Sequence, residues 1–291
     1  MHARRLSLLA LALCGCASTL TTHQLAKAIK PGHAQVNLGA GAYVPVGTIG
    51  SLVGEGVRQV EAFQASVQSG TPYQVTPEDQ QRLLTAAIAL AVLPPSLSQE
   101  LTVRTGILQN WDAGLRYSIN AVRLDSKYQL VHQGDDDELA PGHRSFDVSV
   151  GLGVSRYLFD SPAFDVLDYV QMGDFSRWDL EVPVYVSWEW GEWARAYLAP
   201  KYVWSRTELD ANLVNTSATA SLLLGLDVSA PETVDTHFFG TSAGVMLGYK
   251  YAFLVLEMTG GYTLCRPYVL GQRRDLGGLT LYPSAALDFR F

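Results

Sequence analysis

The sequence predicts an all-β fold, specifically an up-and-down antiparallel transmembrane β-barrel of about ten strands. Three observations predict this fold. Apolar and polar residues alternate with a period of two in ten separate runs, aromatic residues lie on the apolar phase near the ends of several runs, and the last run ends at Phe291. Charged residues are also only 17% of the 291 residues, whereas soluble domains usually carry about a quarter.

The clearest predicted strand spans 179–190. Its even positions, such as Leu180 and Val182, are apolar. Its odd positions include Asp179 and Glu181, so the two faces of this strand differ in polarity. A tilted transmembrane strand needs about 9–11 residues, whereas soluble strands average about 5–6, and the runs favour the first class. The ten runs are 35–45, 99–107, 110–119, 121–131, 146–158, 179–190, 194–206, 237–250, 251–264 and 279–291.

Aromatic residues are predicted to form two girdles at the lipid–water interfaces. Trp111, Trp190 and Tyr249 lie on the apolar phase at strand ends that share one side of the predicted barrel. Tyr202 and Trp204 fall toward the opposite side. Aromatic belts at both interfaces are typical of transmembrane barrels.

The N-terminus has the pattern of an export signal. Residues 1–16 read MHARRLSLLALALCGC, in which Arg4 and Arg5 form a basic region and residues 6–13 form a short apolar core. We therefore predict a signal peptide over residues 1–15.

The residues around Cys16 resemble the bacterial lipobox. Leu13 supplies the aliphatic position and Gly15 the small position ahead of the cysteine, although Cys14 departs from the usual alanine or serine. The resemblance implies lipidation of Cys16, and ordinary cleavage without lipid is the alternative. Residues 16–34 mix Thr, Ala, Pro and Gly without alternation, and we predict that they form a lipidated N-terminal tether.

The C-terminal run LTLYPSAALDFRF alternates up to a terminal phenylalanine. Phe289 and Phe291 share its apolar phase, and this pattern resembles the assembly signal of Gram-negative outer-membrane β-barrel proteins. The resemblance covers residues 1–16 and, loosely, 35–46 and 99–291. It implies insertion into a lipid bilayer by the barrel-assembly machinery, and it implies no substrate.

An even strand number places both ends of the barrel on one side, which we expect to be the periplasm. Turns near positions 109, 191 and 250 are then short and periplasmic, as in known barrels. The lipid anchor is likewise expected on the periplasmic side of the outer membrane. Residues 134–144 fit this topology poorly, because they form a longish periplasmic connection. The predicted external loops are 160–178, 209–236 and 265–278.

An insertion between the first two strands, over 47–98, does not alternate. Val53, Val57 and Val60 recur at helical spacing, and Pro94 ends a second predicted helix. We predict a helical insertion that decorates the external mouth, with a plug of the lumen as the alternative.

The inward phase carries charges of both signs. A ten-stranded barrel is narrow, so these side chains should largely fill it as a salt-bridged core, and a small selective pore is the alternative. The predicted lumen residues are Arg104, Asp112, Arg116, Arg123, Asp125, Lys127, Glu181, Arg195, Lys201 and Glu257.

Two other classes are less well supported by the sequence. Outer-membrane proteases of the omptin family use Asp and His residues at the external rim. Here the cluster of acidic residues 135–137 with His143 falls on the periplasmic side, and Asp174 and His237 lack a recognisable pattern. A periplasm-facing soluble β-sandwich lipoprotein is the second alternative.

The composition disfavours one class of partner. The net charge of −7 disfavours a nucleic-acid partner. We expect no enzyme activity, no cofactor and no metal, and Cys265 is read as an ordinary residue near a strand end.

Overall fold

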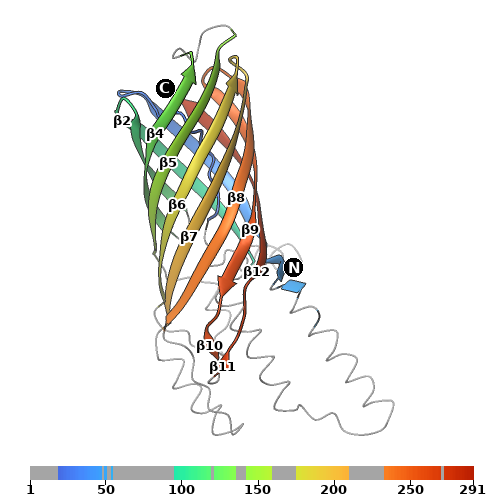
Figure 1. Cartoon of the computed structure of the whole chain (residues 1–291). Helices are drawn as coiled ribbons and strands as arrows, with labels where there is room; N and C mark the ends of the chain where they lie inside the picture. Colours follow the sequence, from blue (N-terminus) through green and yellow to red (C-terminus); the bar gives the residue numbers. More distant parts are fainter. Residues whose placement is uncertain are drawn as a thin grey trace, which may run out of the picture.

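Ten strands pair into one closed antiparallel barrel, as the computed structural model shows (Figure 1). This confirms the predicted fold class and strand number, and it excludes two packed sheets of a sandwich. The structure describes residues 19–47, 49–50, 54, 95–118, 121–135, 142–158, 175–209, 233–269 and 272–291.

Each barrel strand pairs with its neighbour in the chain, and closure joins β1 to β12. In that closing pair Val36 lies opposite Phe289 and Gly41 lies opposite Ser284. The barrel strands are β1 Ala34–Tyr43, β2 Ser96–Leu108, β3 Trp111–Ser118, β4 Ala121–Gly134, β5 Arg144–Tyr157, β6 Phe175–Trp190, β7 Ala194–Leu209, β8 Thr233–Tyr249, β9 Ala252–Cys265 and β12 Gly278–Arg290. Two short strands, β10 Tyr268–Val269 and β11 Gln272–Arg273, form a hairpin that the alternation does not predict.

The apolar phase of the strands faces outward. Along β9, Leu254, Leu256 and Met258 are 46%, 49% and 49% exposed. Between them, Val255 and Glu257 are 0% and 5% exposed. A soluble protein buries large apolar side chains, so an outward face that is apolar over successive strands is the arrangement of a lipid-facing surface.

The two ends of the barrel differ in their connections. The short turns β2–β3, β6–β7 and β8–β9 lie at one end together with Phe291, and we call this the short-turn end (Figure 1). The β10–β11 hairpin lies at the other end, which we call the long-loop end (Figure 1). The connection between β4 and β5, residues 135–143, is at the short-turn end and is longer than its neighbours there.

Most of the predicted insertion at 47–98 lies outside the described residues. Residues 46–47, 49–50 and 54 are helical, and β2 already begins at Ser96. Within the described part of the chain, no helix has the length and apolar character needed to cross a membrane.

Candidate functional site: the occupied lumen

Residues 20–28 lie inside the barrel, and we call them the lumen segment. Every one of them is at most 8% exposed. The segment packs against the wall through apolar clusters, one of which joins Leu20 to Tyr43 and Phe238, while another joins Leu25 to Phe253. The composition of this stretch predicts an N-terminal tether, whereas the structure places residues 20–28 inside the lumen.

A tight turn connects the lumen segment to β1. The amide of His33 donates to the carbonyl of Lys30 at 3.0 Å, and Pro31 and Gly32 occupy the two central positions. Gly32 has φ +83°, a conformation that glycine adopts without the cost that a side chain would add. The chain therefore leaves the lumen at the short-turn end and reverses directly into the first strand.

Carboxylate, amide and hydroxyl oxygens of the wall accept hydrogen bonds from the amides of the lumen segment. Glu257 accepts from the amides of Thr22 at 2.8 Å and His23 at 2.9 Å. Ser187 Oγ accepts from the amide of Ala26 at 3.0 Å. Two further acceptors are Gln129, for the Ala28 amide at 2.8 Å, and Asp112, for the Ile29 amide at 3.0 Å.

Cationic and hydroxyl groups of the wall donate to the carbonyls of the same segment. Lys127 Nζ donates to the carbonyls of Leu25 at 2.6 Å and Lys27 at 3.0 Å. Arg116 donates to the carbonyl of Thr21 at 2.9 Å. A peptide outside any helix or sheet has unpaired backbone groups, and here the wall side chains supply the missing partners. The remaining donors are Lys201 and Thr259 to Leu20, Arg116 to Thr22 and Ser149 to Ala26.

A chain of alternating charges runs around the inner wall. Arg123 contacts Asp125 at 3.6 Å as well as Glu181. Lys127 contacts Asp112 at 3.2 Å. Because each of these groups is buried beside an opposite charge, the network offsets the desolvation cost that an isolated buried charge would carry. In order of contact, the network comprises Lys127, Asp112, Arg104, Asp125, Arg123, Glu181 and Lys201.

The structure places all ten predicted lumen residues inside the barrel. None of them exceeds 6% exposure. Arg195 lies apart from the charge network, where it contacts Glu189 at 3.8 Å and stacks 4.2 Å from the ring centre of Phe253. The ten residues are Arg104, Asp112, Arg116, Arg123, Asp125, Lys127, Glu181, Arg195, Lys201 and Glu257.

Two groups that hold the lumen segment are not among the residues predicted from the sequence. Glu100 is 4% exposed, and its carboxylate contacts His23 at 2.9 Å and Arg116 at 3.4 Å. Glu100 lies four positions before Arg104 within the predicted strand 99–107, so the inward phase of that strand already includes it. His23 has no such signal, because it lies in a stretch without alternation.

The predicted girdle residues all lie on the outward phase. Trp111, Trp190 and Tyr249, near the short-turn end, are 40%, 46% and 63% exposed. Tyr202 and Trp204 are half-buried and lie nearer the long-loop end.

The two phenylalanines of the predicted assembly signal also point outward. Phe289 is half-buried, and Phe291 is 69% exposed. Phe291 extends the closing pair, because its amide donates to the carbonyl of Ala34 at 2.9 Å and its own carbonyl accepts from the Ala34 amide at 3.0 Å.

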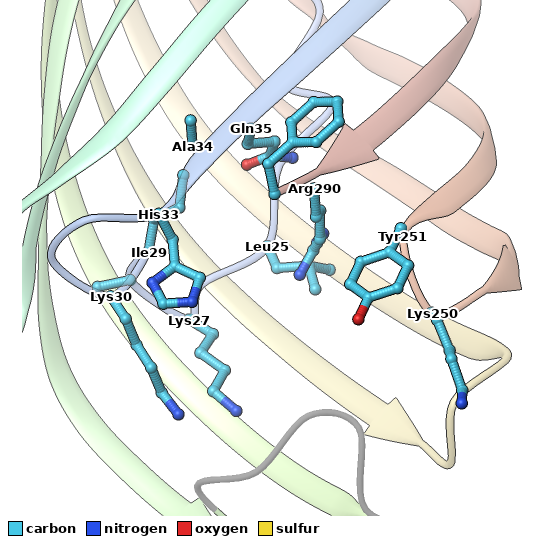
Figure 2. Close-up of a pocket in the computed structure, with 12 residues that line it drawn as sticks. Leu25, Lys27, Ile29, Lys30, His33, Ala34, Gln35, Lys250, Tyr251 and Arg290 are labelled. Atoms are coloured by element: carbon cyan, nitrogen blue, oxygen red, sulfur yellow. The ribbon is translucent and has the colours of Figure 1, made fainter.

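A cavity of about 370 Å³ opens beside the turn at the short-turn end. Figure 2 shows Lys27 and Lys30 on one side of this cavity, with Arg290 and Lys250 on the other. A hydrogen bond with Tyr249 raises the pKa of Lys250, which keeps that side chain cationic. Arg290 is paired with Asp288 at 3.1 Å, and Lys27 donates to the carbonyl of Asp135 at 3.5 Å. This mouth is therefore cationic, but protein groups already engage two of its charges.

The residues considered for catalysis are far apart. His143 is buried at the short-turn end and contacts Glu189 at 3.0 Å, whereas His237 lies on the outward phase toward the long-loop end and contacts Tyr202 at 2.8 Å. Residues 136, 137 and 174 lie outside the described part. Over the described ranges, no group of three or more His, Cys, Asp or Glu side chains could hold a metal ion. Cys265, the last residue of β9, is buried with a free thiol.

Comparisons with known proteins add little to this description. No family model matches the chain, and no curated protein matches it. Among solved structures, the chain is similar to a crystal structure of a double variant of OccD1 (OprD), with 12% identity and a TM-score of 0.20. That match covers 67% of this chain and 60% of that chain. The class established here is therefore a closed, ten-stranded antiparallel β-barrel.

Proposed function

We propose that this protein is an integral outer-membrane β-barrel lipoprotein whose lumen is sealed by its own N-terminal segment. The observation that carries this proposal is the burial of residues 20–28 inside a barrel with an apolar outer face. The proposed lipid anchor is Cys16, and the proposed partners are the bilayer and the barrel-assembly machinery. The role is structural, in that the barrel holds its N-terminal segment in a fixed position in the membrane.

The outer surface supports membrane insertion. Open sheets leave backbone groups unpaired in lipid, whereas a closed barrel pairs all of them between strands. An exposed apolar surface on every strand, including Leu124 at 64% and Leu152 at 52%, would be unfavourable in water. Both conditions for spanning a bilayer are thus present in one fold.

The lumen favours a sealed barrel over a pore. Salt-bridged side chains and the lumen segment share a narrow interior, and several of the wall groups that could line a pore donate to or accept from that segment. Glu257, Lys127 and Arg116 are examples, because each contacts backbone atoms of the lumen segment. A pore function would require the segment to leave, and each of these groups would then lose its partner.

Single-channel recording in planar bilayers tests this proposal. We expect the intact protein, shown to be folded by its altered gel migration when unheated, to give no persistent conductance. The variant Gly39→Leu provides the comparison, because a side chain at Gly39 would first meet the ring of His23 at 3.0 Å and should displace the segment. We expect that variant to show transient openings. A steady conductance from the intact, folded protein would contradict a sealed lumen.

A further inference from the structure

The lumen segment runs through the barrel in a defined direction. Its Leu20 belongs to an apolar cluster with Tyr43 and Cys265, which are the last residues of β1 and β9 at the long-loop end. Its Leu25 belongs to a cluster with Phe253, the second residue of β9 at the short-turn end. Followed backward from β1, the chain therefore enters the lumen at the short-turn end and proceeds toward the long-loop end.

Side chains from nine of the ten barrel strands form hydrogen bonds with residues 20–26, so the wall surrounds this part of the lumen segment. At the short-turn mouth, a Cβ atom at Gly106 would lie 2.3 Å from the carbonyl oxygen of Ile29 and 2.4 Å from that of Lys30, so the chain that follows the lumen segment is in direct contact with β2. Farther toward the long-loop end, a Cβ atom at Gly39 would lie within 3.1 Å of side-chain atoms of both His23 and Glu100. The cavity of about 370 Å³ lies at the short-turn mouth, but a second chain returning past residues 20–26 would have to displace these wall contacts.

We propose that the chain ahead of Thr19 leaves the barrel through the long-loop mouth, so that the mature amino terminus is displayed on the cell surface. This inference rests on the proposed membrane function, because that function identifies the short-turn end as periplasmic. Cys16 is three residues from Thr19 and lies within about 10 Å of it along an extended chain. Acyl chains on Cys16 would then enter the outer leaflet, in place of the periplasmic anchoring that the sequence analysis predicted.

A pair of epitope insertions tests the direction of threading. One flexible epitope of about ten residues, up to about 35 Å when extended, is inserted between positions 17 and 18. The same epitope is inserted into the β8–β9 turn, between Lys250 and Tyr251, as the marker of the opposite end. We expect antibody to bind the first epitope on intact cells and the second only after permeabilisation. Both variants are checked for folding by gel migration without heating.

Two results would overturn the inference. If the N-terminal epitope binds antibody only after permeabilisation, the amino terminus is periplasmic. If antibody reaches both epitopes from the same side of the membrane, the segment does not thread the barrel. Failure of the proposed membrane function has a separate readout, because the protein would then be missing from the outer-membrane fraction of the same cells.

The variant Cys16→Ser separates the effect of the lipid from the effect of the lumen contacts on the placement of the N-terminal segment. We expect this variant to lose incorporation of labelled palmitate but to keep its N-terminal epitope accessible on intact cells, because the hydrogen bonds of residues 20–28 hold the segment in place. If a folded Cys16→Ser protein no longer bound antibody at its N-terminal epitope on intact cells, the lumen contacts would not be what holds the segment threaded through the barrel. A wild-type protein without palmitate label would refute the anchor and leave the direction of threading intact.

Discussion

Replacing Gly106 with alanine should destabilise the barrel by about 3 kcal/mol, the upper part of the range for overpacked interiors. The added methyl group would lie 2.3 Å and 2.4 Å from two backbone carbonyl oxygens, those of Ile29 and Lys30. Backbone atoms cannot rotate aside as a flexible side chain can, so either the chain at Ile29 and Lys30 or β2 must move. The free energy of unfolding is measured by urea titration of the protein folded in detergent micelles.

Trypsin provides a second readout of the same variant. The peptide bond after Lys27 is protected in the intact protein because Lys27 is 8% exposed and its neighbours are buried. We expect faster cleavage after Lys27 in Gly106→Ala, since the segment opens locally more often. Gly260→Ala is the matched control, because Gly260 is also in a strand but its nearest neighbour would be a Leu281 side-chain atom at 3.5 Å. Equal destabilisation of the two variants would contradict the close approach at Gly106.

Replacing Glu257 with glutamine should cost about 2–4 kcal/mol of folding free energy, since charged hydrogen bonds and unpaired buried donors each contribute a few kcal/mol. The carboxylate accepts from the amides of Thr22 and His23 and from the hydroxyl of Tyr197. A glutamine side chain has only one acceptor oxygen, and its NH₂ group would face a donor. At least one buried donor would therefore lose its partner.

The control for this second variant is Glu208→Gln. Glu208 is exposed near the end of β7 and accepts only from Ser176 Oγ at 3.1 Å among the hydrogen bonds described for it. Exposed polar contacts of this kind contribute little, so we expect a change within about 0.5 kcal/mol. Urea titration under identical conditions measures both variants. If Glu257→Gln were as stable as Glu208→Gln, the carboxylate would not be holding the lumen segment.

The strands could be predicted because a barrel wall has two chemically different faces. Where the outward face becomes polar, the predicted alternation ends before the strand does. β8 begins at Thr233, four residues before the predicted start, and there the outward Asp235 pairs with Arg206 at 3.0 Å while Val234 points inward. This reversed pattern lies beyond the apolar band, so hydrophobic periodicity could not detect it.

The lumen segment could not be predicted from periodicity for a different reason. Its residues face wall groups on every side, so neither an apolar face nor a polar face repeats along it. Its partners are also remote in sequence, since Thr22 bonds to Glu257, 235 residues away. The inward charges could be predicted from the alternation of each strand by itself. The peptide that they bind could not, because its composition is typical of a tether.

Quenching of tryptophan fluorescence by brominated lipids tests most directly whether the apolar face contacts acyl chains. The chain has six tryptophans, and none is buried, with Trp178 at 44% and Trp193 at 62% exposure among them. The unmodified protein can therefore be used, folded into vesicles with or without bromine on the acyl chains. We predict strong quenching by the brominated lipid, greatest for bromines near the interfaces where Trp111 and Trp190 lie. Equal fluorescence in the two kinds of vesicle, from protein shown to be folded and vesicle-bound, would contradict the membrane-spanning barrel.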